Sequence, residues 1–253
     1  MTDRDKQLLF SGLVGRVKKC DLCPRMRGSA RVLSAGCGPL NAKLMFIGEA
    51  PGRLGADASE IPFHGDRSGH NFEALLEQVG LTRYDVFVTN AVLCNPKDDK
   101  GNNTTPSSTE IANCAQFLKE QIELLDSPIV VTLGATALKA TSLIEAHNLT
   151  LRNSVRTAVN WAGRKLIPAY HPGQRAMVHR SFANQLSDYQ FISETFRRKI
   201  NKIKPRASQA STRRAEKVTA AAKLLLQVNG ELSYFSLHKL LFLAEVRHLE
   251  STS

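Results

Sequence analysis

Four apolar, β-rich runs alternate with helical stretches along this chain, and this alternation limits the folds open to it. The runs are Lys43–Ile47, Val86–Val92, Ile129–Leu133 and Leu166–Tyr170. Between them, Phe72–Val79 and Ile111–Leu125 place Leu, Ile and Phe at steps of three and four residues, which predicts helices. Such alternation favours a parallel, doubly wound sheet. We therefore predict an α/β fold of three layers, α/β/α, with a central four-stranded parallel sheet.

The segments that directly follow the four runs are the expected ligand-binding positions. In a doubly wound sheet, ligands bind beyond the carboxyl ends of the strands. The segments are polar or Gly-rich, and they are Gly48–Gly52, Thr89-Asn90, Gly134–Thr136 and His171–Gly173.

Four of the five cysteines form a pair and two single positions: Cys20, Cys23, Cys94 and Cys114. The segment Met1–Lys6 is charged and leads into no long apolar run, so we expect no signal peptide. No run approaches the roughly 20 apolar residues of a membrane span, so we expect a cytoplasmic protein with no membrane partner. Reduced thiols there favour an iron–sulfur cluster or zinc over disulfides. Cys37 is interpreted as a loop or core residue, with a ligand role as the alternative.

The basic charge of the chain is concentrated near its C-terminus. The 253 residues carry a formal charge of +11, and residues 197–253 hold 12 Lys/Arg against 4 Asp/Glu. A polyanion such as DNA or RNA fits this surplus, and a solvated basic tail fits it equally well. We predict an α/β domain over 1–196, a basic linker over 197–215 and a short C-terminal helical appendage over 216–253.

Motifs at the predicted sheet edge follow one another in an order that resembles a known family. They are Gly48-Glu49-Ala50-Pro51-Gly52, Pro62-Phe63, Thr89-Asn90 and His171-Pro172. Together they resemble the uracil-DNA glycosylase superfamily, and over residues 13–195 the chain is most similar to the iron–sulfur members of family four. The resemblance implies uracil-containing DNA as the substrate. It also implies a [4Fe–4S] cluster on Cys20, Cys23, Cys94 and Cys114.

The resemblance implies a role for each pocket residue, and side-chain chemistry agrees with it. Phe63 offers a π-face for an extruded base. The amide of Asn90 has a donor and an acceptor that suit the O4 and N3–H edge of uracil. His171 can donate to O2 as negative charge develops on the leaving base. Further substrate-binding positions are Gly48, Ala50 and Asp57. A core Phe, a capping Asn and a structural His are the plainer alternatives.

Three carboxylates compete for the role of positioning the attacking water: Glu49, Asp57 and Asp66. Family-four members carry Glu-Asp-x-x-Gly-x-Pro-Phe, whereas residues 56–63 lack the first acid and the Gly. Residues 65–69 instead resemble the family-five pattern Gly-Asp-x-Ser-Gly, whose Asp is implicated in catalysis. We predict Glu49 as the main water-positioning group, Asp66 as the alternative, and Asp57 as a supporting or capping residue.

The segment after His171 resembles a loop that enters the minor groove of DNA. Met177 is the predicted apolar wedge, with Arg175 and Arg180 near phosphates, although a Met at a helix start also suits a core. Lys97–Thr105 is predicted to be a mobile loop. It lacks the basic stretch of the relatives that link covalently to DNA, so we expect no covalent adduct.

We therefore predict a monomeric, monofunctional glycosylase that hydrolyses the bond between uracil and deoxyribose. No lysine lies within the pocket motifs, so no lyase step is expected. The alternatives are a glycosylase for hypoxanthine or xanthine, a non-catalytic nucleic-acid-binding relative, and a zinc-stabilised toxin–antitoxin accessory module. The last rests on residues 236–244, which resemble the opening helices of Panacea-type domains and suggest a protein partner for the C-terminal segment.

Overall fold

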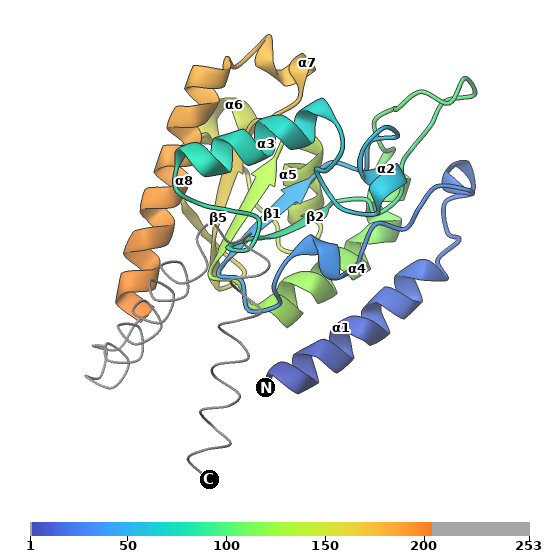
Figure 1. Cartoon of the computed structure of the whole chain (residues 1–253), viewed down its shortest axis with the longest axis horizontal. Coiled ribbons are helices and arrows are strands. Elements are labelled where there is room, and N and C mark those ends of the chain that lie inside the picture. Colours follow the sequence, from blue (N-terminus) through green and yellow to red (C-terminus); the bar gives the residue numbers. More distant parts are fainter. Residues whose placement is uncertain (1, 204–253) are drawn as a thin grey trace, which may run out of the picture. The chain divides into compact units, whose positions relative to one another are not determined.

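A five-stranded sheet in the order β2-β1-β3-β5-β4 forms the centre of the protein (Figure 1). The computed structural model describes residues 2–203. The strands are β1 (Leu44–Gly48), β2 (Phe87–Asn90), β3 (Ile129–Leu133), β4 (Val159–Trp161) and β5 (Arg164–Ala169). The four predicted strands pair in parallel, which confirms the predicted fold class. β4 adds an antiparallel edge strand, which sequence analysis missed because three residues are too few to show a period.

Helices flank this sheet, and two of them begin earlier than their apolar periodicity indicates. The helices are α1 (Asp3–Lys18), α2 (Ala56–Ser59), α3 (Arg67–Gln78), α4 (Ser108–Leu125), α5 (Ala135–Ser142), α6 (Leu151–Ser154), α7 (Gln174–Met177) and α8 (Phe182–Ile203), with 3-10 turns η1 (Pro24–Met26) and η2 (Ala35–Cys37). α3 begins at Arg67 because the Asp66 side chain caps it. α4 begins at Ser108 because Ser107 and Glu110 form a capping box.

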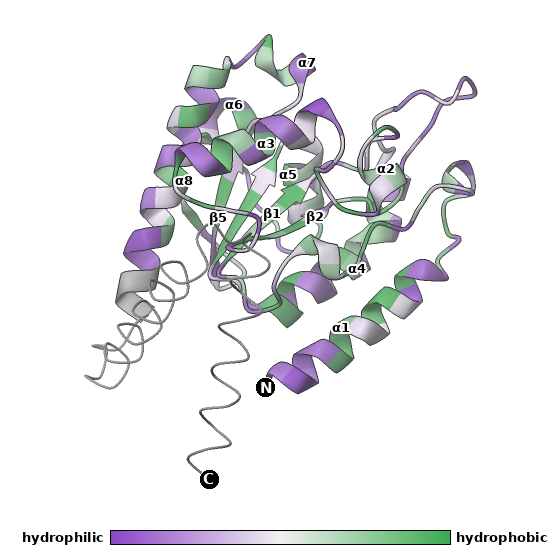
Figure 2. Ribbon diagram, viewed as in Figure 1, coloured by the Kyte–Doolittle hydropathy of each residue, from purple (hydrophilic) through white to green (hydrophobic). Residues whose placement is uncertain are grey.

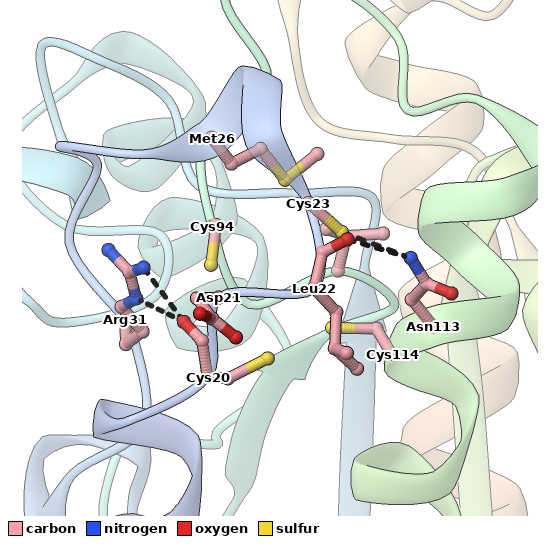
Figure 3. Close-up of a pocket in the computed structure, with 10 residues that line it drawn as sticks. Cys20, Asp21, Leu22, Cys23, Met26, Arg31, Cys94, Asn113 and Cys114 are labelled. Atoms are coloured by element: carbon pink, nitrogen blue, oxygen red, sulfur yellow. Dashed lines mark hydrogen bonds between the residues drawn. The ribbon is translucent and has the colours of Figure 1, made fainter.

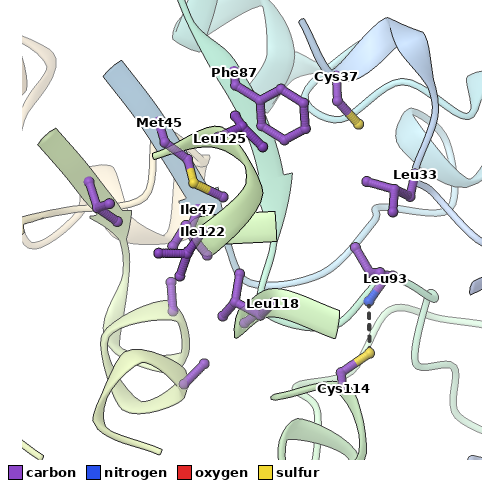
Figure 4. Close-up of a cluster of buried hydrophobic side chains, with 14 of the residues drawn as sticks. Leu33, Cys37, Met45, Ile47, Phe87, Leu93, Cys114, Leu118, Ile122 and Leu125 are labelled. Atoms are coloured by element: carbon purple, nitrogen blue, oxygen red, sulfur yellow. Dashed lines mark hydrogen bonds between the residues drawn. The ribbon is translucent and has the colours of Figure 1, made fainter. Parts of the chain in front are cut away.

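Every residue of β1, β2 and β3 is buried, so apolar side chains project from both faces of the sheet into the protein interior. Met45 and Ile47 belong to the cluster that includes residues of α1, α4 and α5, part of which Figure 4 shows. Leu44 and Phe46 point the other way, into a cluster with residues of α3 and α8. In Figure 2 the central strands are largely hydrophobic, whereas α8 alternates between hydrophilic and hydrophobic residues. One cluster lies on each face of the sheet and packs helices against it, so helices, sheet and helices form the three predicted layers.

α8 is the last described element, and it continues through the predicted domain boundary at residue 196. Residues 197–203, assigned to a linker from sequence, are therefore helical. The remainder of the predicted linker and the predicted appendage lie outside the described residues, so the division into domains stays a prediction. No helix among residues 2–203 is long and apolar enough to cross a membrane.

Candidate active site and cysteine site

A cavity of about 520 Å³ opens where β1, β2 and β5 end, at the edge of the sheet where a ligand was predicted. Its volume lies within the range of small-molecule pockets. The predicted site residues that line it are Glu49, Ala50, Phe63, Asp66, Asn90, His171 and Arg175. Those that do not line it are Gly48, Asp57, Met177 and Arg180.

Phe63 borders the cavity with its backbone in the left-handed region, at φ 51°. This conformation is unfavourable for an aromatic residue, so surrounding contacts must hold it. Arg83 Nη2 donates to the carbonyl of Pro62 at 2.8 Å, and its guanidinium lies 5.7 Å from the centre of the Phe72 ring. A Cβ at Gly69 would stand 2.5 Å from the carbonyl oxygen of Phe63, so only glycine allows this approach. Sequence analysis missed Arg83, because no motif near it marks the contact.

Asn90 presents an amide donor that no described residue satisfies. Its side chain is 2 % exposed, and Nδ2 is buried without a hydrogen-bond partner among residues 2–199. An unpaired buried donor costs about 1–3 kcal/mol, which is a reason to expect a ligand acceptor there. Gly48 makes room for this arrangement, since a Cβ there would stand 2.5 Å from Asn90 Oδ1 and 2.6 Å from Phe63 Cε2.

His171 is held as a neutral ring with one defined hydrogen bond. The backbone N–H of Gly173 donates to Nδ1 at 2.9 Å, so the proton of the neutral imidazole sits on Nε2. Burial lowers the pKa of His171 to about 4, and the nearby charge of Asp66 opposes this shift. Asn71 Nδ2 donates to the carbonyl of Pro172 at 2.8 Å, which fixes the loop on α3. The imidazole can therefore donate a hydrogen bond from Nε2 at neutral pH.

Glu49 is oriented by a contact with the first turn of α5. Thr136 Oγ1 donates to Glu49 Oε2 at 2.5 Å, and Thr136 is 9 % exposed. The other carboxylate oxygen makes no hydrogen bond with the described residues. Sequence analysis placed Gly134–Thr136 at the sheet edge without assigning a role to Thr136.

Asp66 combines a structural contact with a pocket position. Its Oδ1 accepts from the backbone N–H of Gly69 at 2.8 Å and so caps α3. Its Oδ2 lies against the β1–α2 loop, where a Cβ at Gly52 or Gly55 would stand 2.9 or 2.7 Å away. Both carboxylates, Glu49 and Asp66, thus have one anchored oxygen and one without a described hydrogen-bond partner.

Asp57 is occupied by contacts away from the cavity. Its Oδ1 accepts from the backbone N–H of Ala30 at 2.8 Å, and its Oδ2 pairs with Lys97 Nζ at 2.7 Å. These contacts join α2 to the segment after the first two cysteines and to the loop after Cys94. Asp57 therefore connects three segments and does not line the cavity, and the supporting role given to it from sequence stays a prediction.

The predicted DNA-contacting residues differ in their surroundings. Arg175 is exposed at the cavity, and Met177 is partly buried, with Sδ 3.8 Å from Asn71 Nδ2. The guanidinium of Arg180 pairs with the buried Asp188 through two nitrogens, so its charge is already compensated. Val178, which sequence analysis did not single out, is 83 % exposed.

The loop Lys97–Thr105, whose mobility stays a prediction, forms part of the cavity wall and makes hydrogen bonds to neighbouring segments. Asn103 Oδ1 accepts from Asn95 Nδ2 at 2.9 Å and from the backbone N–H of Arg53 at 3.0 Å. Arg25 Nη1 donates to Thr104 Oγ1 at 2.6 Å.

Four cysteines surround a second, smaller cavity: Cys20, Cys23, Cys94 and Cys114 (Figure 3). Desolvation raises the pKa of the Cys94 thiol to about 11 and that of the Cys114 thiol to about 12. Cys37 lies apart from them in the hydrophobic core, as its loop-or-core interpretation predicted.

Polar groups already approach these sulfurs. The backbone N–H of Leu93 donates to Cys114 Sγ, and Asn113 Nδ2 donates to Cys23 Sγ, each at 3.5 Å. Such hydrogen bonds accompany thiolate ligands of metal centres.

Among the described residues, no group of three or more His, Cys, Asp or Glu side chains is arranged so that it could hold a metal ion. Both iron–sulfur clusters and zinc accept a donor set of cysteine sulfurs alone, so the donor chemistry of this site fits either group.

The fold and the cavity define an α/β protein that can hold a planar, hydrogen-bonding ring between an aromatic face, an amide and a neutral imidazole, next to two carboxylates. Residues 35–206 match the family model of the uracil DNA glycosylase superfamily. The chain belongs to this superfamily.

Similar proteins carry the names of two types within the superfamily. A Type-4 uracil-DNA glycosylase of Thermotoga maritima is 37 % identical over 172 residues, which cover 68 % of this chain and 83 % of that protein. A Type-4 uracil-DNA glycosylase of Saccharolobus solfataricus is 34 % identical, over 63 % of this chain and 74 % of that protein. A Type-5 uracil-DNA glycosylase of Pyrobaculum aerophilum is 28 % identical, over 64 % and 82 %.

Proposed function

We infer that this protein is a hydrolase that excises uracil from DNA, the first step in repairing that lesion. The superfamily match and the Type-4 relatives support this function, and they do not favour the broader deaminated-base alternative. The observation that carries the inference is the unpaired Nδ2 donor of Asn90 beside Phe63 and His171. It is the group expected where a pyrimidine presents a carbonyl oxygen.

Each pocket residue then has a chemical task. Phe63 stacks on the extruded uracil, and Asn90 donates to O4 while accepting from N3–H. As the bond between C1′ and N1 breaks, negative charge spreads onto the base, and the Nε2–H of His171 stabilises it at O2. One carboxylate faces the cationic sugar and positions the water whose oxygen bonds to C1′. Uracil and an abasic site are the products.

An excision assay tests this function. Oligonucleotides that carry one uracil, hypoxanthine or xanthine are incubated with the protein, and the abasic product is cleaved with alkali and measured. We expect product from uracil only. Product from hypoxanthine at a comparable rate would establish the broader specificity instead.

We also propose that Cys20, Cys23, Cys94 and Cys114 hold a [4Fe–4S] cluster. When bound, the cluster supplies cross-links between the N-terminal segment, the loop after β2 and α4, and no step of base excision passes through it. Anaerobically purified protein should contain about four irons per chain. Cys94→Ala should lose the iron and its visible absorption, whereas Cys37→Ala should retain both. Stoichiometric zinc with negligible iron would contradict the proposal.

The depressed pKa of His171 predicts a pH dependence of stability. The pKa is about 4 in the folded protein and 6.5 in the reference state, so the unfolded chain binds more protons between these values. The free energy of unfolding should therefore decrease by about 3 kcal/mol as pH falls through this window, from this group alone. Urea unfolding at several pH values should show this extra decrease relative to His171→Gln. Parallel curves for the two proteins would show that the imidazole is not held neutral.

Arg175 is proposed to contact DNA phosphate, and Met177 to lie in the loop that approaches the duplex. A monomeric state, a cytoplasmic location and a protein partner for the C-terminal segment stay predictions.

A further inference from the structure

The loop between β1 and α2 carries two exposed side chains, Arg53 and Leu54, between residues that line the cavity. Its flanking residues Gly52 and Ala56 line the cavity, while Arg53 and Leu54 between them are exposed. Leu54 is 73 % exposed, although the loop that carries it directly follows the fully buried strand β1.

Hydrogen bonds hold the backbone of this loop in a conformation that leaves the Leu54 side chain exposed. The backbone N–H of Arg53 donates to Asn103 Oδ1 at 3.0 Å, and that of Gly55 donates to the carbonyl of Gly52 at 3.2 Å. The inner side of the loop lies against Asp66, because Gly52 and Gly55 have no side chain to separate them from its Oδ2. These contacts hold the loop in a conformation in which the Leu54 side chain points away from its anchored inner side and is 73 % exposed.

A second apolar side chain is exposed near the same cavity, on a different segment. Val178 is 83 % exposed, two residues after Ala176, which lines the cavity. Leu54 follows β1 whereas Val178 follows β5, and β3 separates these strands in the sheet (Figure 1). Arg53 and Arg175 accompany them, and neither forms an ion pair within the described residues. The guanidinium of Arg53 donates only a long hydrogen bond, of 3.4 Å, to the carbonyl of Gly101. Exposed apolar side chains flanked by exposed arginines suit stacked bases with phosphates beside them.

We propose that Leu54 is a second DNA-inserting side chain: it packs against the base pair next to the extruded uracil, with Arg53 on the adjoining phosphate. This inference rests on the proposed function and adds a duplex-contacting element to the same site. Insertion of Leu54 fills stacking space that the extruded nucleotide vacates. Because the loop backs onto Asp66, seating Leu54 on DNA also braces that carboxylate.

Leu54→Ala tests the proposal on two substrates of the same sequence, a duplex with a U:A pair and the corresponding single strand. A single strand has little stacking to replace, so the variant should lose about tenfold in single-turnover rate on the duplex and less than twofold on the single strand. 2-Aminopurine placed next to uracil should report reduced extrusion in the duplex. The matched control is Leu8→Ala, since Leu8 is 75 % exposed on α1, which does not line the cavity.

An equal loss on both substrates would show that Leu54 shapes the pocket rather than inserting, and an unchanged duplex rate would overturn the proposal outright. If the wild type excises uracil from neither substrate, the proposed function fails independently. Affinity for duplex DNA, measured by fluorescence anisotropy, then decides: weaker binding by Leu54→Ala than by Leu8→Ala supports the insertion, and equal binding overturns it.

Discussion

Asn90→Asp is expected to reduce the single-turnover rate of uracil excision by at least about 10²-fold. The amide donor becomes a carboxylate oxygen, which repels O4 of uracil while the other oxygen still accepts from N3–H. Sites built to hydrogen-bond a substrate group discriminate by several orders of magnitude when that bond cannot form. Because Nδ2 has no partner among the described residues, the substitution breaks no contact of the folded protein.

The same substitution should shift base preference, because cytosine offers an amino donor where uracil has O4. Weak excision of cytosine is therefore expected from Asn90→Asp and not from the wild type. Asn160→Asp is the matched control, since Asn160 is also a strand residue but is exposed on β4. Wild-type uracil excision by Asn90→Asp would place base recognition elsewhere.

The sheet edge could be predicted from sequence because its strands are buried on both faces. Continuous apolar runs such as Ile129–Leu133 are visible in a sequence, and the polar residue after each parallel strand then falls at one edge. Asn90 and His171 are 81 positions apart, yet this rule brought them to the same cavity. Their roles came from the family resemblance, with which the hydrogen-bonding groups of the two side chains agree.

The supporting contacts could not be predicted in this way, because each joins side chains distant in sequence through geometry that no pattern encodes. Thr136 donates to Glu49 across 87 positions, and Lys97 pairs with Asp57 across 40. A nearby partner can be just as hard to predict. Asp188 lies only eight positions from Arg180, yet no sequence pattern marks their ion pair.

Two matched substitutions distinguish Glu49 from Asp66 as the carboxylate that positions the water. Glu49→Gln keeps an oxygen that can accept from Thr136, and Asp66→Asn keeps one that can accept from Gly69 and cap α3. Each change thus removes a charge while preserving the anchoring hydrogen bond. A difference in rate between the two variants then reflects the loss of a carboxylate charge near the sugar rather than a disturbed fold.

We expect Glu49→Gln to lose about 10²-fold or more in single-turnover rate with DNA affinity intact, as for an electrostatic or general-base group. Asp66→Asn should lose less. Glu49 directly follows β1, so the sheet fixes its position. Glu49 also lines the cavity, and its Oε1 makes no hydrogen bond with the described residues. Asp57→Asn serves as the control for a neighbouring carboxylate that does not line the cavity. If Glu49→Gln retains the wild-type rate while Asp66→Asn loses the larger factor, Asp66 positions the water and Glu49 supports the pocket through Thr136.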